Sequence, residues 1–188
     1  MSNITDCEFT LKDLPKKRKY LLDRLTEIYS KKNEKEINKI LDSIKIKFRE
    51  QEERGASNHK TRMIFIPLHD IQKYYLKSRD DITNFLEGPK SVLVHEVVHI
   101  FQNLAKDFPH TQYLIKNDDG RYEIDYDKYI ADTGEKQSRF EQVLDMLNWG
   151  FTKPEIIHFL YNRKHDDREL WGSLIDKALE YKKNENQF

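Results

Sequence analysis

SVLVHEVVHIFQNL, residues 91–104, is the stretch around which the fold must be built. Its apolar residues lie on nearly every side of a helix of this length, so we expect a helix buried almost all round. His95 and His99 interrupt the apolar run four residues apart, which places both imidazoles on one helix face. Two histidines and the adjacent Glu96 need a specific role in such a setting, because polar groups are costly to bury.

His95, Glu96 and His99 together form an HExxH pattern. Two imidazoles at this spacing can reach one Zn²⁺ at roughly 2.0–2.1 Å. Glu96 then points into the same cleft, where it can take a proton from the attacking water and pass it to a leaving amine. The pattern therefore predicts a zinc site with Glu96 as general base. The alternative is an ordinary core helix whose histidines are hydrogen-bonded to their neighbours.

A catalytic zinc site has three protein ligands and one open position. A third histidine six residues further along the helix is excluded, because Ala105 stands there, so we expect a glutamate from a second helix. Glu135 has the small Ser138 three residues on, which lets two helices approach closely. Glu141 has the bulky Leu144 at the equivalent place, which belongs to an apolar core face. We predict Glu135 as the third ligand, with Glu141 as the alternative.

Peptide hydrolysis develops negative charge on the scissile carbonyl oxygen, and a tyrosine donor near the metal can stabilise it. Tyr129, six residues before Glu135, is our first choice, followed by Tyr126. Gln102 lies one turn beyond His99 and can orient a ligand or serve as a buried structural amide. The histidines without a surrounding motif are expected to be structural or surface residues: His69, His110, His158 and His165.

The run HEVVHIFQ (95–102), followed by a tyrosine and by Glu135-x-x-Ser138-Arg139, resembles small intracellular zinc metallopeptidases of the gluzincin type. Some of these are phage- or plasmid-borne and carry HExxHxxQ…Y…ExxA(R). The resemblance covers about residues 88–148 and departs from the family at Ser138, where an alanine is usual. It implies a zincin-like fold, a Zn²⁺ cofactor and a peptide or protein substrate.

The composition sets broad limits on partners and compartment. Charged residues make up 35% of the 188 residues, yet the formal net charge is zero, which gives no electrostatic case for nucleic acid or membrane. The basic run at 16–19 is expected to be a solvated helix face. The single Cys7 excludes an intrachain disulfide, and the first thirty residues have no apolar signal segment. We expect a cytoplasmic monomer.

Periodicity and turn residues predict an α+β protein that is mostly helical, with a minimal zincin-like core, an N-terminal helical hairpin and a short β-sheet. The hairpin joins helices expected over 13–29 and 34–52. A strand over 62–66 ends at Pro67 and is expected to form the edge of the substrate cleft, where an extended peptide adds as a strand.

The rest of the chain is predicted in the same way. A helix is expected over 70–86, broken near 78–81, and the motif helix follows with Pro89 in its first turn. Two strands are expected over 111–115 and 121–126, joined by a hairpin turn. Three helices complete the chain: one over 133–148, one that begins at a Thr152–Glu155 capping box, and one over 167–182. We divide the chain into a hairpin at 1–55, a catalytic domain at 56–182 and a disordered tail at 183–188.

Three functions follow from these features. The first is zinc-dependent hydrolysis of a peptide bond in a protein or peptide substrate. The second is a zincin-like binding or inhibitory module with little or no turnover, against which Glu96 argues because a structural site needs no general base. The third, nucleic-acid binding, rests only on the basic run at 16–19 and the terminal helices, and would show a steep loss of affinity with salt.

Overall fold

The structure is a computed structural model that describes residues 7–49, 56–73, 75–105, 114–116, 122–124, 131–160 and 167–185. Over these residues the protein is α+β and mostly helical, as predicted, with a small four-stranded mixed sheet. The chain divides into two compact units, Met1–Leu104 and Ala105–Phe188. Each unit buries an apolar cluster of its own.

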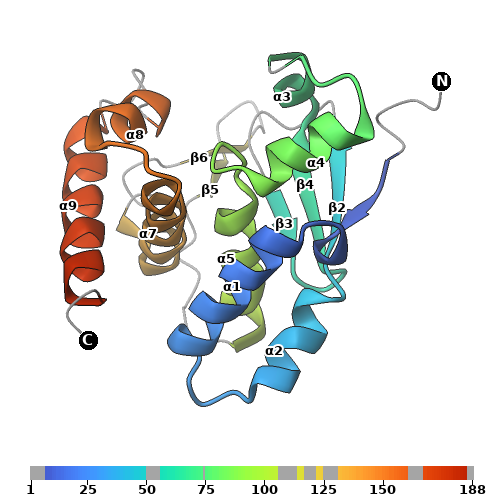
Figure 1. The fold of residues 1–188 in the computed structure, drawn as a ribbon, viewed down its shortest axis with the longest axis horizontal. Helices are drawn as coiled ribbons and strands as arrows, with labels where there is room; N and C mark the ends of the chain where they lie inside the picture. The colour runs from blue at the N-terminus through green and yellow to red at the C-terminus, as the bar shows by residue number, and fades with distance from the viewer. Residues whose placement is uncertain are drawn as a thin grey trace. The chain divides into compact units, whose positions relative to one another are not determined.

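The first unit is built on the four-stranded sheet, with α1, α4 and α5 on one side of it (Figure 1). The strand order is β1-β2-β4-β3, and β2 and β4 are parallel neighbours, with Ile46 opposite Ile64. Side chains of alternate residues point to opposite faces of a strand, so one face buries Ile46, Phe48, Ile64 and Ile66. The strand bounds are Phe9–Thr10 (β1), Lys45–Arg49 (β2), Ala56–Asn58 (β3) and Met63–Pro67 (β4).

The second helix of the predicted hairpin is shorter than expected. Helix α1 spans Pro15–Ile28 and α2 spans Glu34–Leu41, but the helix predicted over 34–52 is wrong beyond Leu41, because β2 follows. Ile44 and Phe48 are four residues apart, which also fits a helix face. The alternation from Lys45 to Arg49 has the period of a strand, and parallel pairing with β4 stabilises that choice.

The strand predicted over 62–66 exists as β4, but its predicted place at the edge of the sheet is wrong. β4 is paired on one side with β2 and on the other with β3, whose residues 56–58 lie opposite residues 63–65. The edge on this side of the sheet is therefore β3. Residues 62–66 are followed by α3 (Leu68–Lys73) and α4 (Arg79–Glu87). The predicted break in this helical stretch exists, but it lies earlier than the predicted residues 78–81, because α4 already begins at Arg79.

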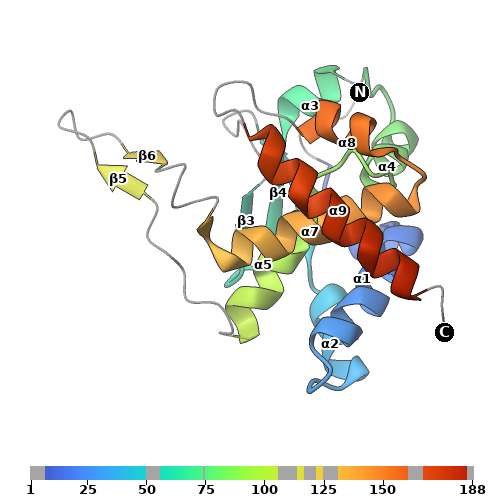
Figure 2. The same ribbon diagram turned by 90° about the vertical axis from the view of Figure 1, so that its left-hand side faces the viewer.

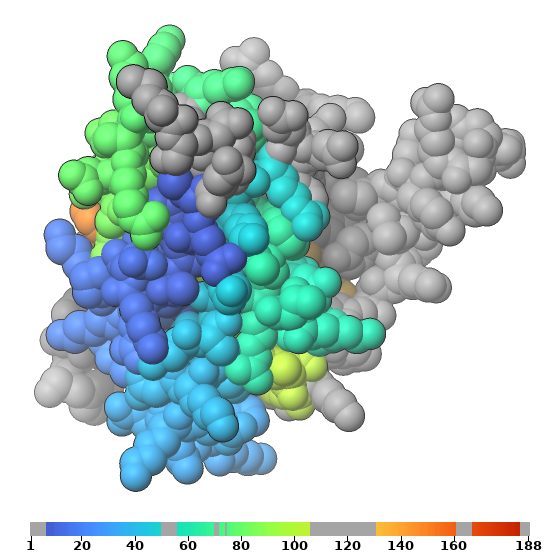
Figure 3. All heavy atoms as spheres, turned by 90° about the vertical axis from the view of Figure 1, so that its right-hand side faces the viewer, coloured from blue at the N-terminus to red at the C-terminus, as the bar shows by residue number. Residues whose placement is uncertain are grey.

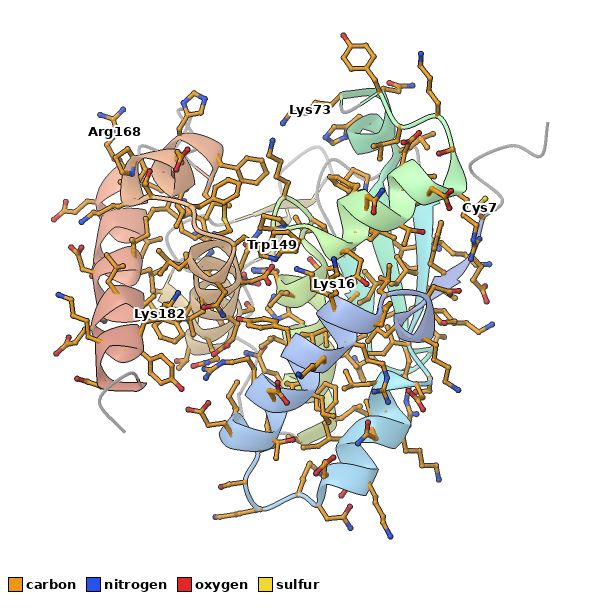
Figure 4. The ribbon with its side chains drawn as sticks, viewed as in Figure 1. Cys7, Lys16, Lys73, Trp149, Arg168 and Lys182 are labelled. Carbon is orange, nitrogen blue, oxygen red and sulfur yellow. The ribbon has the colours of Figure 1, made fainter. Side chains whose placement is uncertain are left out.

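Helix α1 begins without a local side-chain cap, because its N-cap residue is Leu14. Glu87, the last residue of α4, takes over this role. Its carboxylate accepts hydrogen bonds from the backbone N–H groups of Lys16 (3.1 Å) and Lys17 (2.7 Å), and Glu87 is buried. Figure 4 labels Lys16 at the start of α1. A carboxylate at a helix N-terminus satisfies free amide groups and complements the helix dipole.

We expect Glu87→Ala to lower the free energy of unfolding by about 2 kcal/mol, because two hydrogen bonds to a charged, buried acceptor are lost. Urea unfolding followed by far-ultraviolet circular dichroism measures the change. Glu180→Ala, at an exposed position of the last helix, is the control and should change stability by less than about 0.5 kcal/mol. Equal stability of the Glu87→Ala variant and the unmodified protein would show that the cap contributes nothing.

The motif helix, α5, spans Leu93–Ala105 and starts later than predicted. Pro89 is not in its first turn. Residues 88–92 form a turn after α4 instead, in which Gly88 N–H donates to the carbonyl oxygens of Asn84 and Phe85. The Ser91 hydroxyl oxygen then accepts a hydrogen bond from Leu93 N–H at 3.0 Å, which satisfies one free amide at the start of α5.

The second unit contains the helices α7, α8 and α9, which pack against one another (Figure 2). Helix α7 spans Thr133–Asn148, as predicted, and Gly150 follows it with a φ of +84°. One half of the predicted capping box is present, since the Glu155 carboxylate accepts a hydrogen bond from the Thr152 N–H. The carboxylate also accepts from the Thr152 hydroxyl, and this bond is the first cause of the lowered pKa of Glu155.

The remaining helices and strands of the second unit are of the type that the sequence predicted. Helix α8 spans Lys153–Leu160, and α9 spans Arg168–Glu185, so the tail expected to be disordered from 183 is helical as far as 185. The strands β5 (Leu114–Lys116) and β6 (Tyr122–Ile124) pair antiparallel, as the hairpin prediction requires. Among the described residues, none of the helices combines the length and apolar character needed to cross a bilayer.

Candidate metal centre

Helix α5 is closed to solvent over its first ten residues except at the two histidines of the motif, and its last three residues, 103–105, are half-buried. Over residues 93–102, every side chain is buried apart from His95 and His99, which are half-buried. The prediction of a helix buried almost all round is therefore confirmed. The two residues whose chemistry suggested a metal site are the ones that the fold leaves accessible.

The two imidazoles face each other through the nitrogens that would bind a metal. His95 Nε2 and His99 Nε2 are 3.0 Å apart, and the ring planes are inclined by 82°. Two nitrogens bound to one tetrahedral zinc at roughly 2.0–2.1 Å would lie about 3.3 Å apart. The helix thus holds the pair close to the separation that a shared metal ion requires.

Gln102 fixes the orientation of the second histidine. Its Oε1 accepts a hydrogen bond from His99 Nδ1 at 2.9 Å, and the side chain is 1% exposed. A proton on Nδ1 leaves Nε2 with a lone pair, which is the form of histidine that ligates metals. Gln102 is therefore a buried amide whose bonded neighbour is His99, an arrangement compatible with both roles that the sequence left open.

We expect Gln102→Leu to weaken zinc binding by about ten- to hundredfold, since it removes the acceptor that orients the His99 ring. Gln102→Glu keeps an acceptor at the same place and should retain most of the affinity. Competition with a chromogenic chelator measures both variants. Asn103→Ala serves as the control, because the Asn103 amide donates to the His99 backbone carbonyl and not to the ring. An unchanged affinity in Gln102→Leu would exclude the orienting role.

Glu96 is buried on the same helix. It is 5% exposed, and within the described part of the chain its carboxylate makes no hydrogen bond or ion pair. A buried carboxylate without such a partner is costly for stability. A group of this kind is common where a protein keeps a proton acceptor ready for chemistry.

Glu135 lies in the first turn of α7, in the second unit. Its backbone N–H donates to Asp132 Oδ1 at 3.0 Å, so Asp132 is the N-cap of the helix, and the Glu135 side chain is 4% exposed. Three residues on, Ser138 is fully buried, and its hydroxyl donates to the carbonyl oxygens of Gly134 and Glu135. On the helix face that contains Glu135, the neighbouring Ser138 side chain is therefore small, and its hydroxyl group is already hydrogen-bonded.

Glu141, the alternative ligand, lies in a different setting. Its Oε1 accepts a hydrogen bond from Gln137 Nε2 at 2.7 Å, four residues earlier in α7. At about 100° per residue, Glu141 lies roughly 120° around the helix from Glu135. Leu144, three residues beyond Glu141, belongs to the apolar cluster of the second unit, as predicted. The side chains of Glu135 and Glu141 therefore lie on different sides of α7.

The tyrosines proposed for the site, Tyr129 and Tyr126, lie outside the described residues, as do His110 and His165. His69 and His158 are exposed. One contact in the second unit had no signal in the sequence. The Arg139 guanidinium stacks over the Trp171 ring, with Cζ 4.9 Å from the ring centroid, and both residues are buried. Only the packing of α7 on α9 brings these two side chains together.

Comparison with protein-family models, with curated proteins and with solved structures finds no significant match to this chain. The class of the protein therefore rests on its own residues and their geometry.

Proposed function

We propose that the protein is a zinc-dependent peptidase that acts on a protein or peptide substrate. The observation that carries the proposal is the paired Nε2 atoms of His95 and His99, 3.0 Å apart, at the only accessible positions within residues 93–102. Gln102 holds His99 in the metal-binding form, and Glu96 follows His95 directly. An ordinary core helix could also hydrogen-bond its histidines to neighbours, but it gives no reason for a buried glutamate beside two facing Nε2 atoms.

His95, His99 and Glu135 are our proposed ligands of the metal. Together they offer two imidazole nitrogens and one carboxylate oxygen, a donor set that can hold a metal ion and that is typical of catalytic zinc. This grouping favours Glu135 over Glu141, because among the described residues Glu135, and not Glu141, belongs with the two histidines. Tyr129 remains our proposed donor to the carbonyl oxygen of the substrate.

The chemistry divides between the metal and the protein. Bound zinc would polarise the scissile carbonyl and make a water molecule more acidic. Glu96 accepts the proton of the attacking water and then gives it to the leaving amine, so one carboxylate acts first as base and then as acid. Its burial places this proton transfer where electrostatic interactions are strong.

Metal analysis and peptide cleavage test the proposal. Protein purified without added metal should contain close to one zinc per chain, and it should cleave members of a peptide library in a reaction that a chelator stops. A protein that contains no zinc and takes up none would disprove the metal centre. Stoichiometric zinc without cleavage of any peptide or protein substrate would favour the binding or inhibitory module instead.

The compartment and assembly state follow the same proposal. We propose a cytoplasmic monomer, on the basis that Cys7 is the single cysteine and forms no intrachain disulfide. Size-exclusion chromatography with light scattering should give the mass of one chain, and a mass of two or more chains would contradict the monomer.

A further inference from the structure

The outer face of the four-stranded sheet carries a row of positive charges. Lys45, Lys47 and Arg49 alternate along β2 with the buried Ile46 and Phe48, so all three basic side chains lie on the face turned away from the core. Successive members of the row are about 6.6 Å apart along the strand. Figure 3 shows residues of β2 and β4, in cyan and teal, at the surface on this side of the molecule.

β4 contributes apolar side chains beside the row. Phe65 lies opposite Lys47 in the parallel register, and Phe65 and Met63 are half-buried. The Arg49 guanidinium stacks on the Phe65 ring, with Cζ 3.3 Å from the ring centroid. This stacking holds Arg49 against the sheet and covers one face of the ring. A nucleobase could stack there only by displacing Arg49, which disfavours a nucleic-acid platform.

Glu8 demonstrates how the row binds a carboxylate. Glu8 Oε1 is 2.8 Å from Lys45 Nζ, and Glu8 Oε2 is 3.2 Å from Lys47 Nζ. These contacts, with Lys45 first and Lys47 second, lower the pKa of Glu8. One carboxylate is therefore shared by two neighbouring cations. Both lysines therefore hold a carboxylate from the outer face of the sheet, at the two contact distances that a second carboxylate chain would use.

We propose that this face, defined by Lys45, Lys47 and Arg49, binds an acidic, extended segment of a partner protein. An extended chain places every second side chain about 6.6–6.8 Å apart, the same repeat as the row on β2. Carboxylates at alternate positions can then meet successive cations in the way that Glu8 meets Lys45 and Lys47. The inference is independent of the proposed zinc site, because α5, which contains His95 and His99, lies on the other side of the sheet (Figure 1).

Fluorescence anisotropy with a labelled peptide of alternating Glu and Thr tests the proposal. The comparisons are a peptide of alternating Gln and Thr and a single-stranded oligothymidylate with the same number of negative charges. Lys47→Glu combined with Arg49→Glu should weaken binding of the acidic peptide at least tenfold. Lys177→Glu combined with Lys183→Glu, at exposed positions of α9, changes the net charge equally and should alter affinity less than twofold. Raising the salt concentration should weaken binding.

Three results would overturn the proposal: no binding of the acidic peptide by the unmodified protein at millimolar concentration and low salt, equal losses in the two double variants, or tenfold tighter binding of the oligonucleotide. Circular dichroism checks that each variant is folded. If the charge reversal unfolds the protein, Lys45→Gln combined with Lys47→Gln replaces it, because it leaves the Arg49–Phe65 stacking in place. Unchanged affinity in that variant would also count against the proposal.

Discussion

Replacement of Glu96 by Gln should reduce peptide hydrolysis by at least about 10²-fold while zinc binding and the fold are retained. The substitution keeps the size of the side chain but removes the group that accepts and returns the proton. Glu96 is buried at 5% exposure and contributes no metal ligand in our proposal, so neither the core nor the zinc site depends on its charge. The rate should be compared on a peptide that the unmodified protein cleaves.

The comparison needs a matched control. Glu87→Gln is suitable, because Glu87 is also a buried glutamate of the first unit but serves as a cap of α1. It should affect stability more than the rate of hydrolysis. Measuring the zinc content of both variants shows whether a lower rate results from removal of the general base or from loss of the metal. If Glu96→Gln hydrolyses the peptide as fast as the unmodified protein, Glu96 has no part in the mechanism.

The second large effect is expected at Glu135. Glu135→Ala should weaken zinc binding by well over tenfold, because it removes one of three protein ligands from the proposed shell. Glu141→Ala should leave the affinity nearly unchanged, since the carboxylate of Glu141 is bound by Gln137 within α7. The two variants form a matched pair: the same substitution, in the same helix, at two buried glutamates.

A crystal structure with zinc would decide the same question directly. A Glu135 carboxylate oxygen at about 2.0–2.2 Å from the metal is the expected result. Loss of zinc in Glu141→Ala, with normal affinity in Glu135→Ala, would transfer the third ligand to Glu141. That outcome would leave the peptidase proposal intact, because both residues supply a carboxylate.

Secondary structure was predicted most accurately where the apolar residues followed either the helical or the strand spacing, but not both. Helix α7 begins and ends where the pattern placed it, because Asp132 is a cap and Gly150 has the positive φ that glycine favours. β2 was missed because Ile44 and Phe48 satisfy a helical spacing while 45–49 also alternate. Pairing between strands that are distant in sequence decided between the two periods, and such pairing leaves no local signal.

The candidate site likewise has a part that local sequence spacing predicts and a part that depends on contacts between distant residues. His95, Glu96, His99 and Gln102 belong to one helix, so their spacing alone predicted which side chains meet, and the hydrogen bond from His99 to Gln102 bears this out. The choice between Glu135 and Glu141 depends on the side chains around each glutamate, such as Gln137 beside Glu141, and the sequence alone does not show these neighbours. A charged residue can be read as a ligand, a cap or an ion pair, and only its neighbours in space distinguish these roles.

The cap of α1 by Glu87 also has a consequence for how the protein is made. The capping carboxylate is 70 residues further along the chain than the amide of Lys17 to which it binds. At roughly 5–20 residues per second, a ribosome needs on the order of 4–14 s to add that stretch. Throughout this interval α1 has formed, at most, a helix with an unsatisfied start. The first unit therefore cannot complete this cap until α4 has been made, when nearly half of the 188-residue chain has been synthesised.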